Sequence, residues 1–419
     1  MQILIIGKSA KECVLAKKIK EQNPDDIIFI APGNQAVGDY ATCIDIQSDN
    51  VDELIEFALA NEINLTIVSD DLAIENEVVD AFNSSGLMVF GPEKESARFA
   101  INKSVGKRFM YKMSMPTPKF GIFDKENIAR EYLKNSTYPI LIKSDRHEAG
   151  ERNFLCHSER EANNILNKLF AIDMPKVVIE NYVSGREFSF YVVTDGYNAM
   201  PICSVVPFKY ASEKDGGSIT SGVGAYTPAI FVDEELTYKI LNEIIYPALT
   251  EIEKTSSPYV GVLGVDIILD NKNNIQVIEF NPFFNEPDIE AVFELLDENI
   301  VSLFKACTVG SLADDYEFVK INDGASASIV LTKIAEHLFD DTEKEITGLD
   351  ELDDEIKVNL YNALNKNGKI NAKSGRILSL TSKASTLTRA KSNIYDWIDC
   401  VNFKGKKFRK DILENINER

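Results

Sequence analysis

The sequence predicts a multidomain protein of mixed α/β and α+β class, with a parallel-sheet N-terminal α/β domain and a small C-terminal α+β domain. Three observations lead to this prediction. The chain has 419 residues, enough for about two to four domains at roughly 150 residues each. Short apolar runs alternate with helical patterns near its start, which is typical of a parallel sheet. Longer strands joined by turns follow, as in α+β proteins.

The N-terminal elements follow from the periodicity of apolar residues. Runs rich in Ile, Leu and Val predict strands, and segments with apolar residues three and four apart predict helices. The expected strands are residues 3–6, 27–30 and 65–68, and the expected helices are residues 11–21, 52–61 and 93–113. The extended segment Met115-Pro-Thr-Pro118 then marks a domain boundary.

The remaining elements are mostly strands. Between about residues 119 and 320 we expect strands at 140–143, 177–180, 187–194, 262–269 and 275–280. A smaller α+β unit follows from about residue 321, with strands expected at 326–332 and 376–381. No internal repeat is evident.

Composition excludes several classes of function. The 66 acidic residues against 45 basic ones give a net charge of -21, which repels nucleic acid and anionic membranes. Six cysteines without a CxxC pair or a Cys/His cluster indicate neither a disulfide framework nor structural zinc. The first apolar run is too short for a signal peptide, and none approaches the ~20 residues of a membrane span. We therefore expect a cytoplasmic protein with small-molecule partners. We also expect a monomer or a homodimer, although composition does not decide between them.

A hairpin predicts the most informative site. Two apolar strands flank the turn Asn271-Lys-Asn-Asn274, and pairing residue 270 with residue 275 sets Asp266 opposite Glu279. Like charges at such a position destabilise the pair unless something neutralises them. Asn281 projects from the same face as Glu279, so these three side chains suit Mg²⁺ (or Mn²⁺) shared with nucleotide phosphates. The alternative is a solvated sheet face without a metal.

A second segment suits a nucleoside. The strand ending at Glu180 leads through Tyr182 and Val183 to a turn at Gly185, and Glu187 opens the next strand. Such a linker can present backbone groups to a purine, and a carboxylate beyond it can accept hydrogen bonds from ribose hydroxyls. A plain β-turn-β unit with two surface glutamates is the alternative.

Lysines and a glycine-rich segment suggest phosphate binding. Lys143 ends an apolar strand, and Lys103 opens Lys-Ser-Val-Gly; either lysine would attract phosphate or simply extend from the surface. Residues 215–228 are rich in Gly, Ser and Thr, and we expect them to form a loop that cradles an anion or is merely flexible.

Taken in order, these pieces resemble the phosphoribosylamine–glycine ligase family of ATP-grasp enzymes over essentially the whole chain. The matching segments are Ala31-Pro-Gly-Asn34, residues 65–68, Gly91-Pro92, Lys103, Lys143, residues 178–187, residues 224–228, residues 277–281, Gly375-Arg376 and residues 408–412. The resemblance implies an N-terminal domain (1–102), two ATP-grasp subdomains, the first with a lid (103–190) and the second with the hairpin (191–320), and a C-terminal domain (321–419).

The resemblance also implies an activity and its residues. Mg-ATP would phosphorylate a carboxylate, and an amine would displace phosphate from the acyl phosphate to form an amide. Residues implied for ATP are Lys103, Lys143, Glu180, Tyr182, Val183 and Glu187; for the metal, Asp266, Glu279 and Asn281; for catalysis, Lys143, Gly224 and Arg376. Asp266 matches the general ATP-grasp pattern rather than this family's own.

The chain departs from the family pattern around the expected substrates. It has Lys8-Ser-Ala-Lys-Glu-Cys13 after the first strand, Ala149-Gly-Glu-Arg152 in the lid, and Phe283 where the family has arginine. Negative charge at Asp70, Asp71, Glu148 and Glu151 would lie near expected phosphates, where like charges repel. Two alternatives therefore stay open: a paralogous ligase for another acid and amine, and a non-catalytic nucleotide-binding scaffold.

Overall fold

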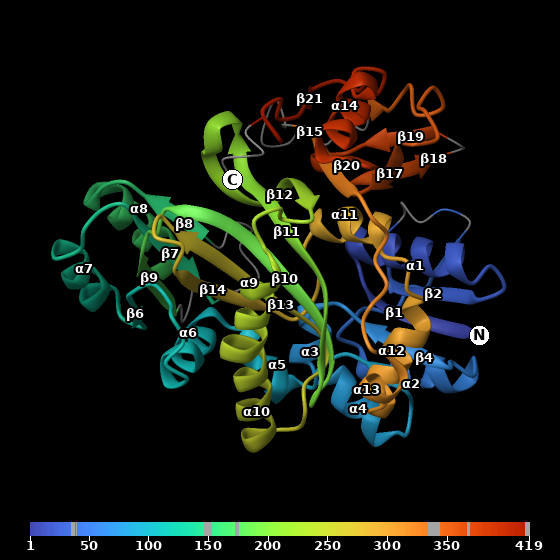
Figure 1. The fold of residues 1–419 in the computed structure, drawn as a ribbon, viewed down its shortest axis with the longest axis horizontal. Coiled ribbons are helices and arrows are strands. Elements are labelled where there is room, and N and C mark those ends of the chain that lie inside the picture. Colours follow the sequence, from blue (N-terminus) through green and yellow to red (C-terminus); the bar gives the residue numbers. More distant parts are fainter. Residues whose placement is uncertain are drawn as a thin grey trace.

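The computed structural model describes residues 1–34, 38, 40–145, 153–171, 176–333, 344–366 and 369–414. The N-terminal part is a parallel sheet in the order β3-β2-β1-β4-β5, with helices between the strands (Figure 1). This confirms the predicted α/β domain. Its elements are β1 (Gln2–Gly7), α1 (Ala10–Gln22), β2 (Ile27–Pro32), β3 (Thr42–Cys43), α2 (Val51–Ala60), β4 (Leu65–Val68), α3 (Asp71–Glu75), α4 (Val78–Ser84) and β5 (Val89–Phe90).

The single helix predicted over residues 93–113 is wrong, because two helices occupy this stretch. Asn102 separates them with an extended backbone, φ −97° and ψ 117°. The N–H of Ser104, in the first turn of the second helix, donates to Asp145 at 2.6 Å, and a carboxylate stabilises a helix start. A contact with a distant segment thus fixes the new start. The two helices are α5 (Lys94–Ile101) and α6 (Lys103–Lys112).

A four-stranded antiparallel sheet follows in the order β6-β9-β7-β8. Two helices contribute Ala129, Leu133 and Leu166 to the separate hydrophobic core of this unit. The elements are β6 (Phe120–Phe123), α7 (Glu126–Lys134), β7 (Ile140–Ser144), β8 (Asn153–Cys156), α8 (Glu159–Phe170) and β9 (Val177–Asn181).

The largest sheet has nine strands, in the order β14-β13-β10-β11-β12-β15-β20-β17 with β21 beside β15. The loop expected over residues 215–228 is wrong: most of it is a strand, because β11 and β15 pair with it on either side. The strands are β10 (Gly185–Asp195), β11 (Ala199–Ser212), β12 (Gly216–Thr227), β13 (Val260–Asp270), β14 (Ile275–Asn281), β15 (Ala325–Lys333), β17 (Lys357–Leu360), β20 (Gly375–Ala384) and β21 (Lys406–Lys407).

Helices and a small sheet complete the fold around these layers (Figure 1). Because β12 pairs with β15, the largest sheet continues across residue 320; the division into four domains stays a prediction. Among the described residues, no helix is long and apolar enough to cross a membrane. The elements are η1 (Glu213–Asp215), α9 (Glu234–Ile240), η2 (Leu241–Ile245), α10 (Tyr246–Thr255), α11 (Asp288–Leu295), α12 (Ile300–Val309), α13 (Leu312–Asp315), β16 (Lys344–Glu345), β18 (Ala363–Lys366), β19 (Lys369–Ala372) and α14 (Leu387–Trp397).

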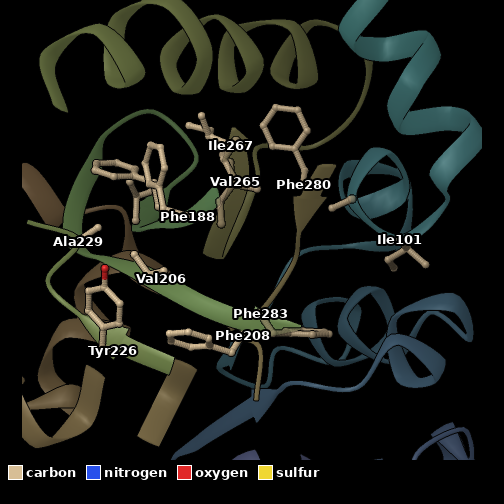
Figure 2. Close-up of a cluster of buried hydrophobic side chains, with 14 of the residues drawn as sticks. Ile101, Phe188, Val206, Phe208, Tyr226, Ala229, Val265, Ile267, Phe280 and Phe283 are labelled. Atoms are coloured by element: carbon tan, nitrogen blue, oxygen red, sulfur yellow. The ribbon is translucent and has the colours of Figure 1, made fainter. Parts of the chain in front are cut away.

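The main hydrophobic core covers one face of the largest sheet. Figure 2 shows Phe188 of β10 beside Val265 and Ile267 of β13, with Phe280 of β14 close by. Successive side chains of a strand point to opposite faces, so the residues between these apolar ones lie on the other face. That other face carries the polar residues described next.

Candidate active site

A row of polar side chains lies on the face of the largest sheet opposite the core. Four neighbouring strands contribute to it: β10 pairs with β11 and β13, and β13 pairs with β14. Alternation brings residues that are far apart in the sequence to this one face. We call Glu187, Ser189, Lys209, Asp266, Glu279 and Asn281 the polar row.

The hairpin of β13 and β14 pairs Asp266 with Glu279, as predicted, but by a different route. The prediction placed the residue after Leu269 opposite Ile275, whereas Leu269 itself occupies that position. The register then shifts by one residue at Ile278, and only beyond this β-bulge does Asp266 face Glu279. The predicted pair is therefore correct although the predicted register near the turn is wrong.

Asp266 is fully buried, and both of its carboxylate oxygens have partners. Oδ1 accepts a hydrogen bond from Ser189 Oγ at 2.6 Å, and Oδ2 accepts one from Lys209 Nζ at 2.7 Å. Lys209 Nζ also lies 2.7 Å from Glu187. Burial acts to lower the pKa of Lys209, but these two carboxylates hold it well above its usual value. A lysine thus neutralises Asp266, and the role of Asp266 as a metal ligand stays a prediction.

Glu279 lies between two lysines that the sequence assigned to phosphate. Its Oε2 is 3.1 Å from Lys103 Nζ and 3.5 Å from Lys143 Nζ. Burial acts to raise the pKa of Glu279, but Lys103, Lys143 and Lys209 together hold it well below its usual value. Beyond it, the side-chain nitrogen of Asn281 is buried and has no hydrogen-bond partner among the described residues. The three lysines therefore favour the ionised form of Glu279.

Behind Glu279 lies a buried chain of three charges. Glu180 is fully buried and ion-paired to Lys143 at 2.6 Å and to Lys107 at 2.7 Å. Burial lowers the pKa of Lys107 to about 8, although Glu180 opposes the shift. The attraction of the two lysines outweighs burial at Glu180 and lowers its pKa. Lys143 therefore joins two carboxylates, Glu180 and Glu279, across two sheets.

A first cavity, cavity A, of about 450 Å³ opens between the two antiparallel sheets. Its walls combine aliphatic side chains with the linker between β9 and β10, and it collects every residue predicted to contact the nucleoside. The lining includes Pro118, Pro139, Leu141, Lys143, Leu155, Glu180, Tyr182, Val183, Glu187, Val206, Lys209, Ile268, Ile278 and Glu279.

A second cavity, cavity B, of about 580 Å³ adjoins the first. It is more highly charged and takes residues from the N-terminal domain, the polar row, the segment after β14 and β20. The lining includes Ser9, Lys11, Asp71, Lys103, Lys209, Asp266, Glu279, Asn281, Phe283, Glu286, Asp288 and Arg376. Lys209 and Glu279 line both cavities, so the two meet at these side chains.

Arg376 and Gly224, the other two residues predicted to be catalytic, differ in their position relative to the two cavities. Arg376 lines cavity B, pairs with Glu286 at 2.7 Å and lies over the ring of Tyr361 at 4.8 Å. Gly224 is not among the described residues that line either cavity. A Cβ there would lie 2.5 Å from Ile412, so this glycine allows a close approach of the C-terminal segment. The structure therefore brings Arg376, and not Gly224, to the site.

The structure describes only some of the residues that depart from the family pattern. Asp71 lines cavity B, whereas Asp70 Oδ1 accepts the N–H of Leu72 at 2.8 Å and caps α3. Phe283 lines cavity B with Lys11 Nζ 4.6 Å from its ring centroid, a cation–π distance. The lid segment 149–152, with Glu148 and Glu151, lies outside the described residues.

Sequence reasoning missed several side chains of the site. Lys209 follows an apolar stretch of strand, which is the signal that identified Lys143, so the same reasoning applied to residues 205–209 finds it. No such signal marks Lys107 or Ser189, because their partners come from other parts of the chain. Asp288 gives no sequence signal either, although it lines cavity B.

Helix α11 carries two similar buried carboxyl–tyrosine pairs. Tyr191 donates to Asp288 Oδ2 at 2.7 Å, and Tyr361 donates to Glu290 Oε1. Burial raises the pKa of Asp288 to about 7 and that of Glu290 to about 8. In each pair the second carboxyl oxygen has no hydrogen-bond partner among the described residues.

Comparison with known protein families gives matches along most of the chain. Models of phosphoribosylglycinamide synthetase match in three consecutive parts: the N domain at residues 1–100, the ATP-grasp (A) domain at 101–289 and the C domain at 340–414. A phosphoribosylamine–glycine ligase from Pasteurella multocida is 32% identical, covering 98% of this chain and 97% of the relative. One from Caldanaerobacter subterraneus is 29% identical, covering 98% and 99%.

Solved structures share the fold. A phosphoribosylamine–glycine ligase from Thermotoga maritima superposes with a TM-score of 0.82 at 24% identity, covering 98% of this chain and all of that one. A biotin carboxylase from Campylobacter jejuni, solved as a beta-gamma-ATP complex, gives a TM-score of 0.72 at 16% identity over 99% and 96% of the two chains. At these identities the structural likeness establishes the fold.

Proposed function

We propose that this chain, which belongs to the phosphoribosylglycinamide synthetase family, is an ATP-dependent ligase that joins phosphoribosylamine to glycine in purine biosynthesis. The observation that best supports the proposal is the meeting of cavities A and B at Lys209 and Glu279. A ligase of this type needs a nucleotide site and an acid–amine site that share one boundary, because a phosphoryl group passes from one to the other.

Cavity A suits ATP. Aliphatic side chains such as Leu141, Ile268 and Ile278 offer flat apolar surfaces to a purine, and the linker at Tyr182 and Val183 offers backbone groups to its edge. Lys103 and Lys143 lie toward the boundary, where the triphosphate would end. Their charge attracts phosphate, although each now contacts Glu279. ATP binding would therefore redistribute these ion pairs.

The residues present also fit a divalent cation. The neighbouring lysines favour the ionised form of Glu279, and Asn281, two residues later in β14, adds a side-chain amide whose buried nitrogen has no hydrogen-bond partner among the described residues. Mg²⁺ typically uses one or two carboxylates together with substrate phosphates. In the described part of the chain, no group of three or more His, Cys, Asp or Glu side chains is arranged so that it could hold a metal ion, so an all-protein cage is not expected there. Bound Mg²⁺ would supply charge neutralisation.

Cavity B suits the acid and the amine. A carboxylate oxygen of glycine would attack the γ-phosphorus, releasing ADP and leaving an acyl phosphate. The amine of phosphoribosylamine would then attack the carbonyl carbon, the C–O bond would break, and phosphate would leave as the amine loses a proton. Lys209 is placed at the boundary, where negative charge develops during both steps. Lys11 and Arg376 supply further positive charge to cavity B.

Formation of ADP by the purified protein with Mg²⁺ and ATP tests this proposal. We expect the rate with glycine and phosphoribosylamine together to exceed the rate with either omitted by at least about tenfold. Removal of Mg²⁺ by chelation should abolish it. Equal rates with and without the two substrates would contradict the proposal.

A ligase of the same type with another acid and amine is the second candidate. Asp71 and Phe283, both in the lining of cavity B, favour it because neither side chain attracts a sugar phosphate. Turnover of another acid–amine pair from a panel, at a higher kcat/KM than glycine with phosphoribosylamine, would favour this candidate. The cytoplasmic location and the monomeric or homodimeric state stay predictions.

A further inference from the structure

The two carboxyl groups on α11 form a natural comparison. Asp288 and Glu290 are 1% and 2% exposed, each accepts a hydrogen bond from a buried tyrosine, and each keeps one oxygen without a partner among the described residues. An ionised oxygen buried without a donor is costly, so an arrangement of this kind favours binding of a group that supplies one. The two residues are similar in all these respects.

They differ in what they face. Asp288 lines cavity B, whereas Glu290 is not among the described residues that line it. Tyr191, which holds Asp288 Oδ2, is fully buried and also accepts the backbone N–H of Asn285 at 3.1 Å, so the carboxyl is held in one orientation. The unpartnered Oδ1 of Asp288 therefore belongs to a fixed acceptor in the wall of the proposed acid–amine site.

The nearby charges limit what this acceptor can bind. Asp266 and Glu187 add negative charge around Asp288, and Lys209, whose positive charge opposes theirs, is already paired to both of them. An anionic group of a substrate is thus disfavoured beside Asp288, and a cationic donor is favoured. A primary ammonium has three N–H donors on a compact centre, which suits a single fixed carboxylate oxygen.

We propose that Asp288 binds the ammonium group of an α-amino acid in cavity B, so that the amino acid's carboxylate is directed to the boundary at Lys209 and Glu279. This inference rests on the proposed function, because it assigns one end of the acid substrate within the same site. It makes Asp288 a specificity determinant: acids without an ammonium group, such as glycolate and acetate, lose this contact.

The test measures ADP formation with glycine, glycolate or acetate as the acid, at saturating ATP and phosphoribosylamine. The wild-type protein should prefer glycine to glycolate by at least about tenfold in kcat/KM, the factor for one charge-assisted hydrogen bond. Asp288→Asn should raise the KM for glycine about 10- to 100-fold, while the KM for ATP and the kcat/KM for acetate change less than about twofold.

Glu290→Gln is the matched control, because it removes the other buried carboxyl of α11 and should leave the KM for glycine within about twofold. The proposal is overturned if Asp288→Asn leaves the KM for glycine unchanged, if acetate turnover falls equally, or if Glu290→Gln has the same effect. Equal use of glycine and glycolate by the wild-type protein also overturns it, and that result does not depend on whether a variant folds.

If the proposed function itself is wrong, the result differs from the outcomes that overturn only the ammonium site. In that case the wild-type protein forms no ADP with glycine and phosphoribosylamine, and binding of other acids decides the inference. The melting temperature of the wild-type protein with Mg²⁺ and a non-hydrolysable ATP analogue is then measured with α-amino acids and with the matching α-hydroxy acids. Stabilisation by an amino acid and not by its hydroxy acid supports the ammonium site. If no amino acid stabilises the protein more than its matching hydroxy acid does, the ammonium site is overturned.

Discussion

Replacing Glu279 with glutamine should lower the rate of ADP formation by at least about 100-fold, because it removes the ionised carboxylate at the boundary of the two cavities. The amide cannot neutralise Lys103 and Lys143, which lie 3.1 and 3.5 Å from the carboxylate, and it is a poorer ligand for Mg²⁺. Binding of an ATP analogue measured with and without Mg²⁺ should show that the metal no longer strengthens binding.

Glu298→Gln is a suitable control for this variant. Glu298 is a buried carboxylate, 8% exposed, and is not among the described residues that line cavity A or cavity B. Its loss should change the rate less than about twofold. An unaltered Mg²⁺ dependence of nucleotide binding in Glu279→Gln would remove Glu279 from the metal site.

The second large effect is expected for Lys143→Met. Lys143 is 3% exposed and lies between Glu180 and Glu279, so its removal leaves two buried carboxylates with one fewer cation. Breaking a buried ion pair from one side typically costs about 3–5 kcal/mol. We expect a loss of unfolding free energy of this order in urea, and a higher KM for ATP because a phosphate-binding charge is lost.

Lys94→Met supplies the same substitution in an exposed pair. Lys94 and Glu77 lie 2.7 Å apart with side chains 40% and 59% exposed, so this variant should lose less than about 1 kcal/mol. If the two methionine variants are equally stable, the buried charge chain does not stabilise the fold as described. If Lys143→Met binds ATP as tightly as the wild-type protein does, the assignment of Lys143 to phosphate binding is wrong.

Local patterns in the sequence were sufficient for the parts of the site that depend on one hairpin or one strand. The pairing of Asp266 with Glu279 needed only two apolar strands and a turn. Even so, the bulge at Ile278 was not predictable, because no glycine or proline marks it. The pairing was correct because the one-residue error at the turn and the bulge cancel.

Contacts between segments far apart in the chain could not be predicted from local sequence patterns. The extended residue Asn102 interrupts a helical pattern because Asp145, 41 residues after Ser104, caps the second helix. Residues 216–227 have a loop-like composition, yet pairing with β11 and β15 makes them a strand. The same limit explains why Tyr191 and Asp288, 97 residues apart, were not connected. Tertiary context overrides local propensity in each case.

In the proposed reaction, a carboxylate in cavity B accepts a phosphoryl group from ATP in cavity A before the amide forms. Glycine labelled with oxygen-18 in its carboxylate tests this most directly, with the released inorganic phosphate analysed by mass spectrometry. Each released phosphate should carry one labelled oxygen, because the C–O bond of the acyl phosphate breaks when the amine attacks. Unlabelled phosphate accompanying amide formation would contradict the proposed reaction.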